Sequence, residues 1–233
     1  MERPVFPPRV LLAHTPTPLQ PLERLSRQLG GPIIWVKRDD MTGVALTGNK
    51  VRKLEFSLGE ARERGADTII TCGGLQSNHC RATAAAGAML GLKVHLILRG
   101  QPEGVPDGNQ FLDHLFGAEL SCYPPNFYRS RLNDIFQGLV EDCQRQGRRP
   151  HIIPLGASDA TGLWGYIAAS EELRSDCERA DLTPHHIVCA TGSGGTLAGL
   201  IAGNAIFGLG AQVWGFAVCD DEAYFVTKVR GDL

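Results

Sequence analysis

Residues 186–199, HIVCATGSGGTLAG, join an apolar run to a glycine-rich turn and then to an alanine-containing segment. The apolar run over 186–190 is typical of a buried strand, and the small residues that follow favour a helix. The same strand–turn–helix order recurs along the chain, most clearly over 68–90. Strands that alternate with helices through short loops predict an α/β protein with parallel sheets covered on both faces. Ligands of such folds bind beyond the carboxyl ends of the strands, so the turns after Thr71 and Ala190 are the first candidates for a site.

The apolar runs and the glycine and proline positions predict the remaining elements. Strands are expected at 33–37, 68–71, 94–98, 119–123, 152–154, 186–190 and 212–218. Helices are expected at 22–29, 49–64, 77–90, 108–116, 129–146, 163–179 and 194–207, with a further loop and helix start from 220 onward.

The composition is that of an ordinary globular protein. Of 233 residues, 43% are hydrophobic and 21% are charged, and 23 Lys+Arg against 25 Asp+Glu leave a net charge of -2. Nucleic acid is not an expected partner, because binding to a phosphate backbone usually needs a basic excess. A membrane is not expected either, since no apolar stretch reaches the roughly 18 to 20 residues of a spanning helix. Seven singly placed cysteines favour neither a disulfide scaffold nor a metal site, and they fit a cytoplasmic protein best, with an organelle as the alternative.

The glycine-rich turn over 192–196 is suited to holding an anion. Its glycines let successive backbone N–H groups converge, and the helix that follows adds the partial positive charge of its N-terminus. The turn is not a dinucleotide fingerprint, because Leu197 stands where GxGxxG needs its last glycine. A Walker loop also fails, since Asn49 interrupts the nearest match at residues 43–50. We therefore predict a phosphate cradle here, with a plain strand-to-helix turn as the alternative.

Three cations, Lys50, Arg52 and Lys53, stand at a predicted helix start directly after a glycine. Cations at a helix N-terminus oppose the helix dipole and cost roughly 0.3–1 kcal/mol each. The cluster therefore indicates either a bound anion or a lysine whose amine is partly neutral, because neighbouring positive charge lowers a lysine pKa. An unprotonated lysine is the nucleophile of Schiff-base chemistry. A solvated basic helix end is the alternative.

A run of four polar residues follows the strand that ends near Thr71: Gln76, Ser77, Asn78 and His79. Capping a helix needs only one such side chain. A run of four is typical of a cluster that grips a carboxylate or an oxygen-rich ring, with capping alone as the alternative. A phosphate cradle, a lysine in a cationic setting and a carboxylate-binding turn are the three parts that a pyridoxal-phosphate enzyme needs.

Several strings in a fixed order also make the sequence resemble a known family. They are TPTPL at 15–19, VKRDD at 36–40, GNKVRKLEF at 48–56, QSNH at 76–79 and GSGGT at 192–196. Over nearly its whole length the chain resembles the D-cysteine desulfhydrase and 1-aminocyclopropane-1-carboxylate deaminase family of fold-type II pyridoxal-phosphate enzymes. The resemblance implies two open, twisted parallel-sheet α/β domains of the tryptophan synthase β-like class. The smaller domain would span 51–159, and the larger, cofactor-binding domain would combine 1–50 with 160–233 and be incomplete.

The resemblance further implies a role for each candidate residue. Lys50 would bind pyridoxal 5′-phosphate covalently and move the substrate's α-proton, Lys53 would contact the phosphate, and Asn78 would contact the ring hydroxyl. The substrate carboxylate would lie against Ser77, Asn78 and His79, and Ser77 would also act in catalysis. The phosphate loop would consist of Gly192, Ser193, Gly194, Gly195 and Thr196. The resemblance implies no metal.

The reaction implied is α,β-elimination of D-cysteine to pyruvate, ammonia and hydrogen sulfide, by a carbon–sulfur lyase that forms a homodimer. His79 favours this activity, because the resemblance implies Gln at that position in the deaminases. The alternatives are 1-aminocyclopropane-1-carboxylate deaminase and a catalytically inactive, shortened form.

The chain departs from the family pattern in two places. Residues 156–159 are Gly-Ala-Ser-Asp where the family tends to have Gly-Gly-Ser-Asn, which places an added carboxylate near the pocket. The family also continues past Leu233 with a hydroxyl partner of the pyridine nitrogen and a pocket tyrosine. We therefore expect apolar sheet surface of the larger domain to be exposed.

Overall fold

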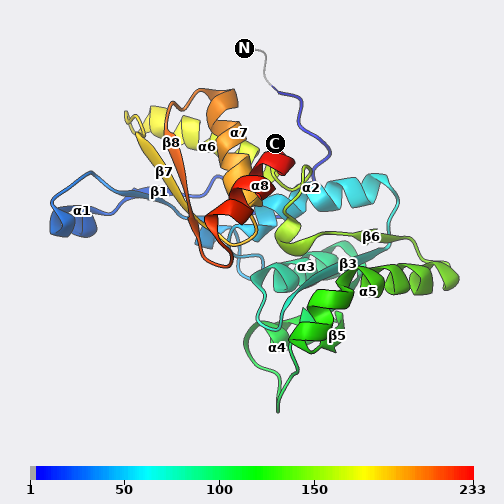
Figure 1. The fold of residues 1–233 in the computed structure, drawn as a ribbon. Helices are drawn as coiled ribbons and strands as arrows, with labels where there is room; N and C mark the ends of the chain where they lie inside the picture. The colour runs from blue at the N-terminus through cyan, green and yellow to red at the C-terminus, as the bar shows by residue number, and fades with distance from the viewer. Residues whose placement is uncertain (1–3) are drawn as a thin grey trace.

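The computed structural model describes residues 4–233 and shows strands and helices that alternate along most of the chain (Figure 1). The strands are β1 (Leu19–Pro21), β2 (Trp35–Lys37), β3 (Thr68–Gly74), β4 (Lys93–Arg99), β5 (Glu119–Tyr123), β6 (Pro150–Ile152), β7 (His186–Thr191) and β8 (Gln212–Ala217). The α-helices are α1 (Glu23–Leu29), α2 (Lys50–Glu63), α3 (Asn78–Leu90), α4 (Gly108–Leu115), α5 (Pro125–Arg145), α6 (Trp164–Arg179), α7 (Gly195–Phe207) and α8 (Glu222–Asp232). Short 3-10 turns lie at Asp39–Met41 and Leu155–Ala157. The α/β class predicted from the sequence is confirmed.

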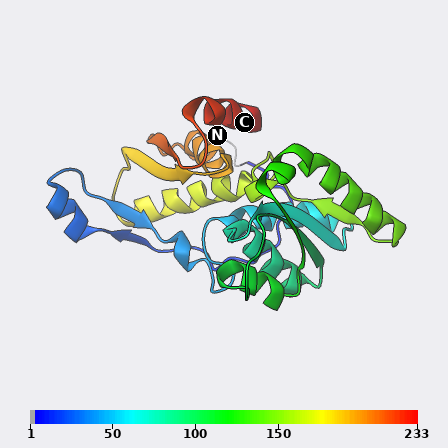
Figure 2. The same cartoon turned by 60° about the horizontal axis from the view of Figure 1, so that its bottom comes forward.

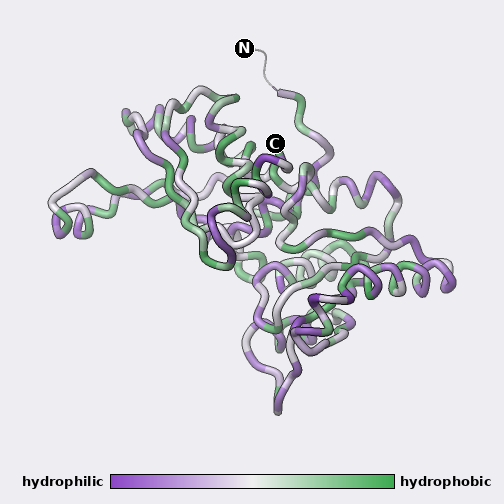
Figure 3. Tube along the Cα trace, in the orientation of Figure 1, coloured by the Kyte–Doolittle hydropathy of each residue, from purple (hydrophilic) through white to green (hydrophobic). Residues whose placement is uncertain are grey.

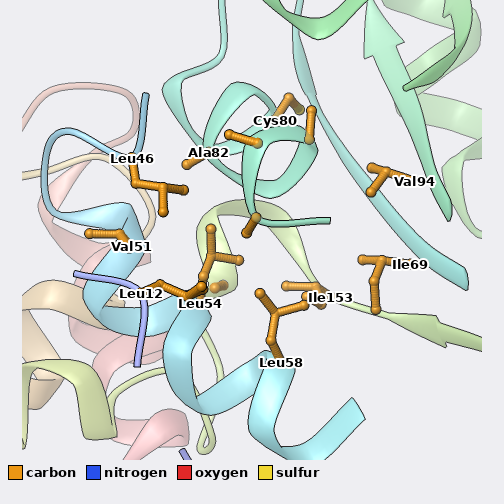
Figure 4. Packing of buried hydrophobic residues seen from close by; sticks show 14 of the residues in the cluster. Leu12, Leu46, Val51, Leu54, Leu58, Ile69, Cys80, Ala82, Val94 and Ile153 are labelled. Carbon is orange, nitrogen blue, oxygen red and sulfur yellow. The ribbon is translucent and has the colours of Figure 1, made fainter. Parts of the chain in front are cut away.

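A parallel four-stranded sheet forms the larger core, in the strand order β5-β4-β3-β6. Side chains alternate between its faces, so that Ile69 packs towards α2 and α3 whereas Ile70 packs towards α5. Figure 4 shows the first of these clusters, in which Leu54 and Leu58 of α2 gather with Ile69 and Ile153. Helices cover both faces of this sheet, as the sequence predicts.

The second parallel pair, β7 and β8, is covered differently. Tyr166 of α6 and Leu200 of α7 pack on one face, against alternate side chains of the two strands. On the opposite face, Val188, Trp214 and Phe216 are 62%, 45% and 61% exposed. The prediction that both faces are covered is wrong for this sheet, because no described element packs on that side. The exposed apolar surface expected in the larger domain lies here.

The strand predicted at 33–37 differs most from expectation. Only Trp35–Lys37 is extended, and it pairs antiparallel with β1, which the sequence pattern did not predict. The hydrogen bond from Leu22 N to Ile34 O continues this ladder at 2.7 Å, so residues 22–34 fold back as a local excursion rather than crossing to a parallel neighbour. Figure 2 shows this excursion projecting from the body, and Figure 3 shows that its helix α1 is mostly hydrophilic. Accordingly, α1 has no buried residue.

Local chemistry explains where two helices begin. Helix α5 begins at Pro125, one turn before the predicted start, because proline is already constrained to a helical φ and needs no donor in the first turn. Helix α3 begins after Ser77, whose hydroxyl accepts a 3.2 Å hydrogen bond from Cys80 N. Within residues 4–233, no helix is long and apolar enough to cross a membrane.

Helix α2 connects the core to the N-terminal segment through a buried carboxylate. Glu55 is completely buried and accepts hydrogen bonds from Leu12 N at 2.7 Å and Ala13 N at 2.8 Å. The Arg9 guanidinium donates to the same carboxylate at 2.6 and 2.8 Å. The N-terminal segment is thus fixed along α2, beside the residues that precede the candidate lysine. The division into domains at 51–159 stays a prediction.

The substitution Glu55→Ala tests this anchor. It leaves one buried N–H group, one partly buried N–H group and a partly buried guanidinium without their acceptor, so we expect the free energy of unfolding to fall by about 2–4 kcal/mol. Urea titration measures the loss, and Glu63→Ala, on the exposed side of the same helix, is the matched control. Equal and small losses in the two variants would contradict the anchoring role.

Candidate functional site

The three cations at the start of α2 occupy three different environments. Lys50 is half-buried, and its Nζ donates to Asn49 Oδ1 at 3.1 Å. Lys53 is completely buried, and its Nζ donates to Ser158 Oγ at 3.0 Å. Arg52 points elsewhere, into an ion network described below. The interpretation of this cluster as a solvated basic helix end is therefore wrong for Lys53 and Arg52.

Lys50 and the glycine-rich turn line the same cavity. This cavity has a volume of about 490 Å³, and its wall includes Asn49, Lys50, Thr196 and residues 192–194. A 3.0 Å hydrogen bond from Asn49 Nδ2 to Thr196 Oγ1 ties the residue before Lys50 to the turn. Residues 147 positions apart are thereby held at one site, at the carboxyl end of β7.

Donors converge beside the glycine-rich turn in a way that fits a phosphate group. Gly195 N donates to Ser158 Oγ at 3.2 Å, Lys53 Nζ reaches the same oxygen, and Ser193 Oγ lies 2.8 Å from it. Gly194 has a φ of 88°, a left-handed conformation that strongly favours glycine. A Cβ on Gly195 would lie 2.7 Å from Ser158 Oγ, so the turn approaches that oxygen as closely as backbone allows. Lys53 Nζ, the Ser193 hydroxyl and the N-terminal N–H of α7 thus surround one oxygen. Such a set of donors is suited to binding a phosphate.

Burial dominates the electrostatics of the two lysines. It lowers the pKa of Lys50, a shift that the nearby Cys219 opposes. It also holds the pKa of Lys53 well below its ordinary value, and the positive charge of Lys50 lowers that pKa further, whereas Asp159 opposes the shift. A larger fraction of each amine is therefore uncharged near neutral pH than in an exposed lysine.

His79 is a neutral residue inside the core of the four-stranded sheet. It is 2% exposed, and burial together with the charges of Lys53 and Lys50 holds its pKa well below the ordinary value. Its Nε2 lies 2.8 Å from Thr71 Oγ1, which itself donates to the carbonyl of Ile153. Thr71 must therefore accept from His79 Nε2–H, so Nδ1 carries the lone pair, and Nδ1 has no partner among the described residues. The imidazole thus offers an acceptor near two lysines and no positive charge for a carboxylate.

The polar run at 76–79 is only partly brought to the cavity. Ser77 caps α3, and Gln76 and Asn78 are exposed and hydrogen-bond to Asn109 in α4. Within the described chain, the wall of the 490 Å³ cavity includes none of the three residues predicted to hold the substrate, Ser77, Asn78 and His79. Their roles stay predictions, and His79 is linked to the site by its electrostatic coupling to Lys50 and Lys53.

An ion network beside the cavity was not predicted. Arg52 donates to Asp39 at 2.8 and 3.0 Å and to Glu172 at 2.9 Å, and the Tyr166 hydroxyl donates to Asp39 at 2.6 Å. Asp39 and Tyr166 also line the cavity. The string VKRDD was the available signal for Asp39, but the partner Glu172 lies 120 residues from Arg52.

Helix α8 supplies Lys228, a further residue near the site that the sequence did not predict. It lies against α7 (Figure 1), and its Lys228 Nζ donates to the Ser158 carbonyl at 3.0 Å and pairs with Asp232. A Cβ on Gly194 would lie 3.1 Å from Lys228 Cγ, so α8 packs directly on the glycine-rich turn. No motif in residues 220–233 signals this contact.

Comparisons with known proteins find similar sequences and structures. The model of the family described as pyridoxal-phosphate dependent enzyme matches residues 10–226. A bifunctional D-cysteine desulfhydrase/1-aminocyclopropane-1-carboxylate deaminase from Arabidopsis thaliana is 43% identical over 231 residues, which cover 95% of this chain and 57% of that protein. A putative 1-aminocyclopropane-1-carboxylate deaminase from Thermotoga maritima is 44% identical, with 95% and 70% covered. A D-cysteine desulfhydrase from Serratia proteamaculans is 41% identical, with 84% and 60% covered.

Solved structures show the same likeness. The crystal structure of an ACC deaminase homologue superposes with a TM-score of 0.86 at 36% identity, covering 97% of this chain and 69% of the other. A threonine deaminase, at a TM-score of 0.69 and 20% identity, shares the fold. The chain thus spans 57–70% of the length of these curated relatives.

Replacing the buried cation tests the phosphate cradle. In Lys53→Met, loss of a charge-assisted hydrogen bond should weaken binding of pyridoxal 5′-phosphate by about tenfold to a hundredfold, with little effect on pyridoxal, which lacks the phosphate. Without ligand, the same variant should be more stable at neutral pH, because the folded state no longer holds an amine of lowered pKa. That gain should shrink as the pH rises towards the ordinary lysine pKa, since the unfolded chain then loses its extra proton too.

Absorbance titration measures both affinities, and urea titration over a pH series measures stability. Lys93→Met, an exposed lysine on β4, is the matched control. An equal loss of affinity for pyridoxal and its phosphate would show that Lys53 does not bind the phosphate.

Proposed function

The chain belongs to the family of pyridoxal-phosphate dependent enzymes, and on this premise we propose that it eliminates hydrogen sulfide from D-cysteine, with pyruvate and ammonia as the other products. The observation that carries the proposal is the shared cavity of Lys50 and the glycine-rich turn, with Lys53 buried beside that turn against Ser158 Oγ. The relatives named D-cysteine desulfhydrase support the choice of substrate. We further propose a cytoplasmic homodimer acting on a small amino acid.

Each residue of the site has one proposed task toward the cofactor. Lys53, Gly195 N and the Ser193 hydroxyl would hold the phosphate, because they already converge on one oxygen. Lys50 would bind the aldehyde carbon, and Asn78 would contact the ring hydroxyl. When bound, the cofactor supplies an electron sink that stabilises negative charge on the substrate's α-carbon after proton loss.

The lowered pKa of Lys50 gives the amine its chemical role. An uncharged Nζ can attack a carbonyl carbon and can later accept the α-proton of the substrate, whereas an ammonium group can do neither. Burial supplies this state without a dedicated neighbouring base. Asn49 accepts a hydrogen bond from Nζ and is itself tied to Thr196, so the lysine is held beside the phosphate turn while it acts.

Ser77, Asn78 and His79 would receive the substrate at the start of α3. Helix α3 directs its N-terminal partial positive charge to this end, which favours a carboxylate. His79 keeps a neutral, buried imidazole at this end of α3, with Nδ1 unpartnered among the described residues.

1-Aminocyclopropane-1-carboxylate deaminase is the second candidate, because relatives carrying that name are equally similar to the chain. The two activities differ in the bond that breaks, carbon–sulfur in one and the cyclopropane ring in the other. A catalytically inactive member of the family is the third candidate.

Product analysis of the purified chain separates the candidates. With pyridoxal 5′-phosphate bound, D-cysteine should release sulfide and pyruvate in equal amounts, and Lys50→Ala should lower the rate about a hundredfold or more, because the proton-transfer group is lost. Lys93→Ala should act like the wild type. Release of 2-oxobutyrate from the cyclopropane substrate alone would establish the deaminase, and retention of cofactor without either product would establish the inactive form.

A further inference from the structure

The first turn of α4 locks the polar loop that precedes α3. Asn109 N donates to Gln76 Oε1 at 2.8 Å, and the Asn109 side-chain Nδ2 donates to the Gln76 carbonyl and to Asn78 Oδ1, each at 2.9 Å. Gln76 Nε2 in turn donates to Asp107 Oδ1 at 2.9 Å. One asparagine of α4 therefore holds two of the four polar residues at 76–79.

Elementary hydrogen-bond chemistry fixes the orientation of each amide in this network. A backbone carbonyl only accepts, so the Asn109 atom facing the Gln76 carbonyl must be its NH₂ group. That same NH₂ group faces Asn78, so the Asn78 atom 2.9 Å away must be the acceptor oxygen. The backbone N–H of Asn109 fixes Gln76 in the same way, because an N–H only donates.

The consequence is a defined donor at position 78. Asn78 has its oxygen taken up by Asn109, and its own NH₂ group has no hydrogen-bond partner within residues 4–233. The side chain is exposed, so this NH₂ group can meet a ligand. Position 78 thus presents a free hydrogen-bond donor, whereas its oxygen already accepts one hydrogen bond.

Glycine is favoured at the adjoining position. Gly108 has a φ of 51°, a left-handed conformation that strains other residues. A Cβ there would also lie 2.5 Å from Gln76 Oε1, so it would displace the Gln76 amide that accepts from Asn109 N.

We propose that Asn109 is a positioning residue, which turns the Asn78 amide so that its NH₂ group donates to the ring oxygen of pyridoxal 5′-phosphate. The inference rests on the proposed function and adds the residue that determines the direction of this hydrogen bond. A donor at the ring oxygen stabilises negative charge there, which lowers the oxygen's affinity for a proton. Asn109 acts through Asn78 and does not touch the cofactor itself.

The isosteric substitution Asn109→Asp tests the proposal. A carboxylate cannot donate to Asn78 Oδ1 and instead accepts from its NH₂ group, which removes the donor from the ligand. We expect the dissociation constant for pyridoxal 5′-phosphate to rise about threefold to tenfold, the effect of one hydrogen bond. We also expect the midpoint of the pH titration of the bound cofactor's visible absorbance to move to higher pH. Asn133→Asp, on the exposed surface of α5, is the matched control and should change neither quantity.

A double-mutant cycle with Asn78→Ala separates positioning from general damage. Asn78→Ala alone should reproduce both effects, and adding Asn109→Asp to it should change neither affinity nor midpoint further. If Asn109→Asp unfolds, Asn109→Ala replaces it in the cycle, because it removes the donor to Asn78 Oδ1 without introducing a charge. Additive effects, or weaker binding with an unmoved midpoint in Asn109→Asp, would overturn the inference.

The same measurements also separate failure of the Asn109 proposal from failure of the proposed function. A wild-type chain that binds the cofactor at Lys50 and shows an additive cycle contradicts only the role of Asn109. A wild-type chain that fails to bind the cofactor contradicts both the proposed function and this inference.

Discussion

A single buried oxygen, Ser158 Oγ, joins the parts of the protein that form its site. It accepts hydrogen bonds from the buried Lys53 side chain in α2 and from the first N–H of α7, and it contacts Ser193 in the glycine-rich turn. A buried ammonium group without an anionic partner is costly, and burial accordingly holds the pKa of Lys53 well below its ordinary value. The hydrogen-bond acceptor of Lys53 among the described residues is a hydroxyl, an environment that an anionic ligand such as a phosphate would complement.

Burial of ionisable side chains is unfavourable for stability, but it also changes their protonation. It lowers the pKa of Lys50, Lys53 and His79, so the uncharged form of each group is favoured more than it would be at an exposed surface. Arg52, on the same helix, remains charged and is neutralised by ion pairs with Asp39 and Glu172. Asp39 of this network also lines the cavity. One helix start thus contains a lysine in the cavity wall, a buried lysine beside the glycine-rich turn and a structural ion pair.

Much of this could be predicted from the sequence, because the decisive signals are local. The apolar runs and glycines located β3, β7 and the turn at 192–196, and the family resemblance selected Lys50 as the reactive lysine. The missing parts depend on contacts between distant residues. Nothing local shows that Trp35–Lys37 pairs with Leu19–Pro21, that α8 packs on the turn, or that Asn109 orients Asn78 from 31 positions away. The exposed apolar face of β7 and β8 was expected from the family resemblance and not from any local sequence pattern.

The most direct test of the account is to find which lysine binds the cofactor's aldehyde. The purified chain would be incubated with pyridoxal 5′-phosphate, reduced with borohydride, digested and analysed by mass spectrometry. We expect the pyridoxyl phosphate label on Lys50, because its amine shares the cavity with the glycine-rich turn. A label found mainly on Lys53, Lys228 or a surface lysine such as Lys93 would contradict it.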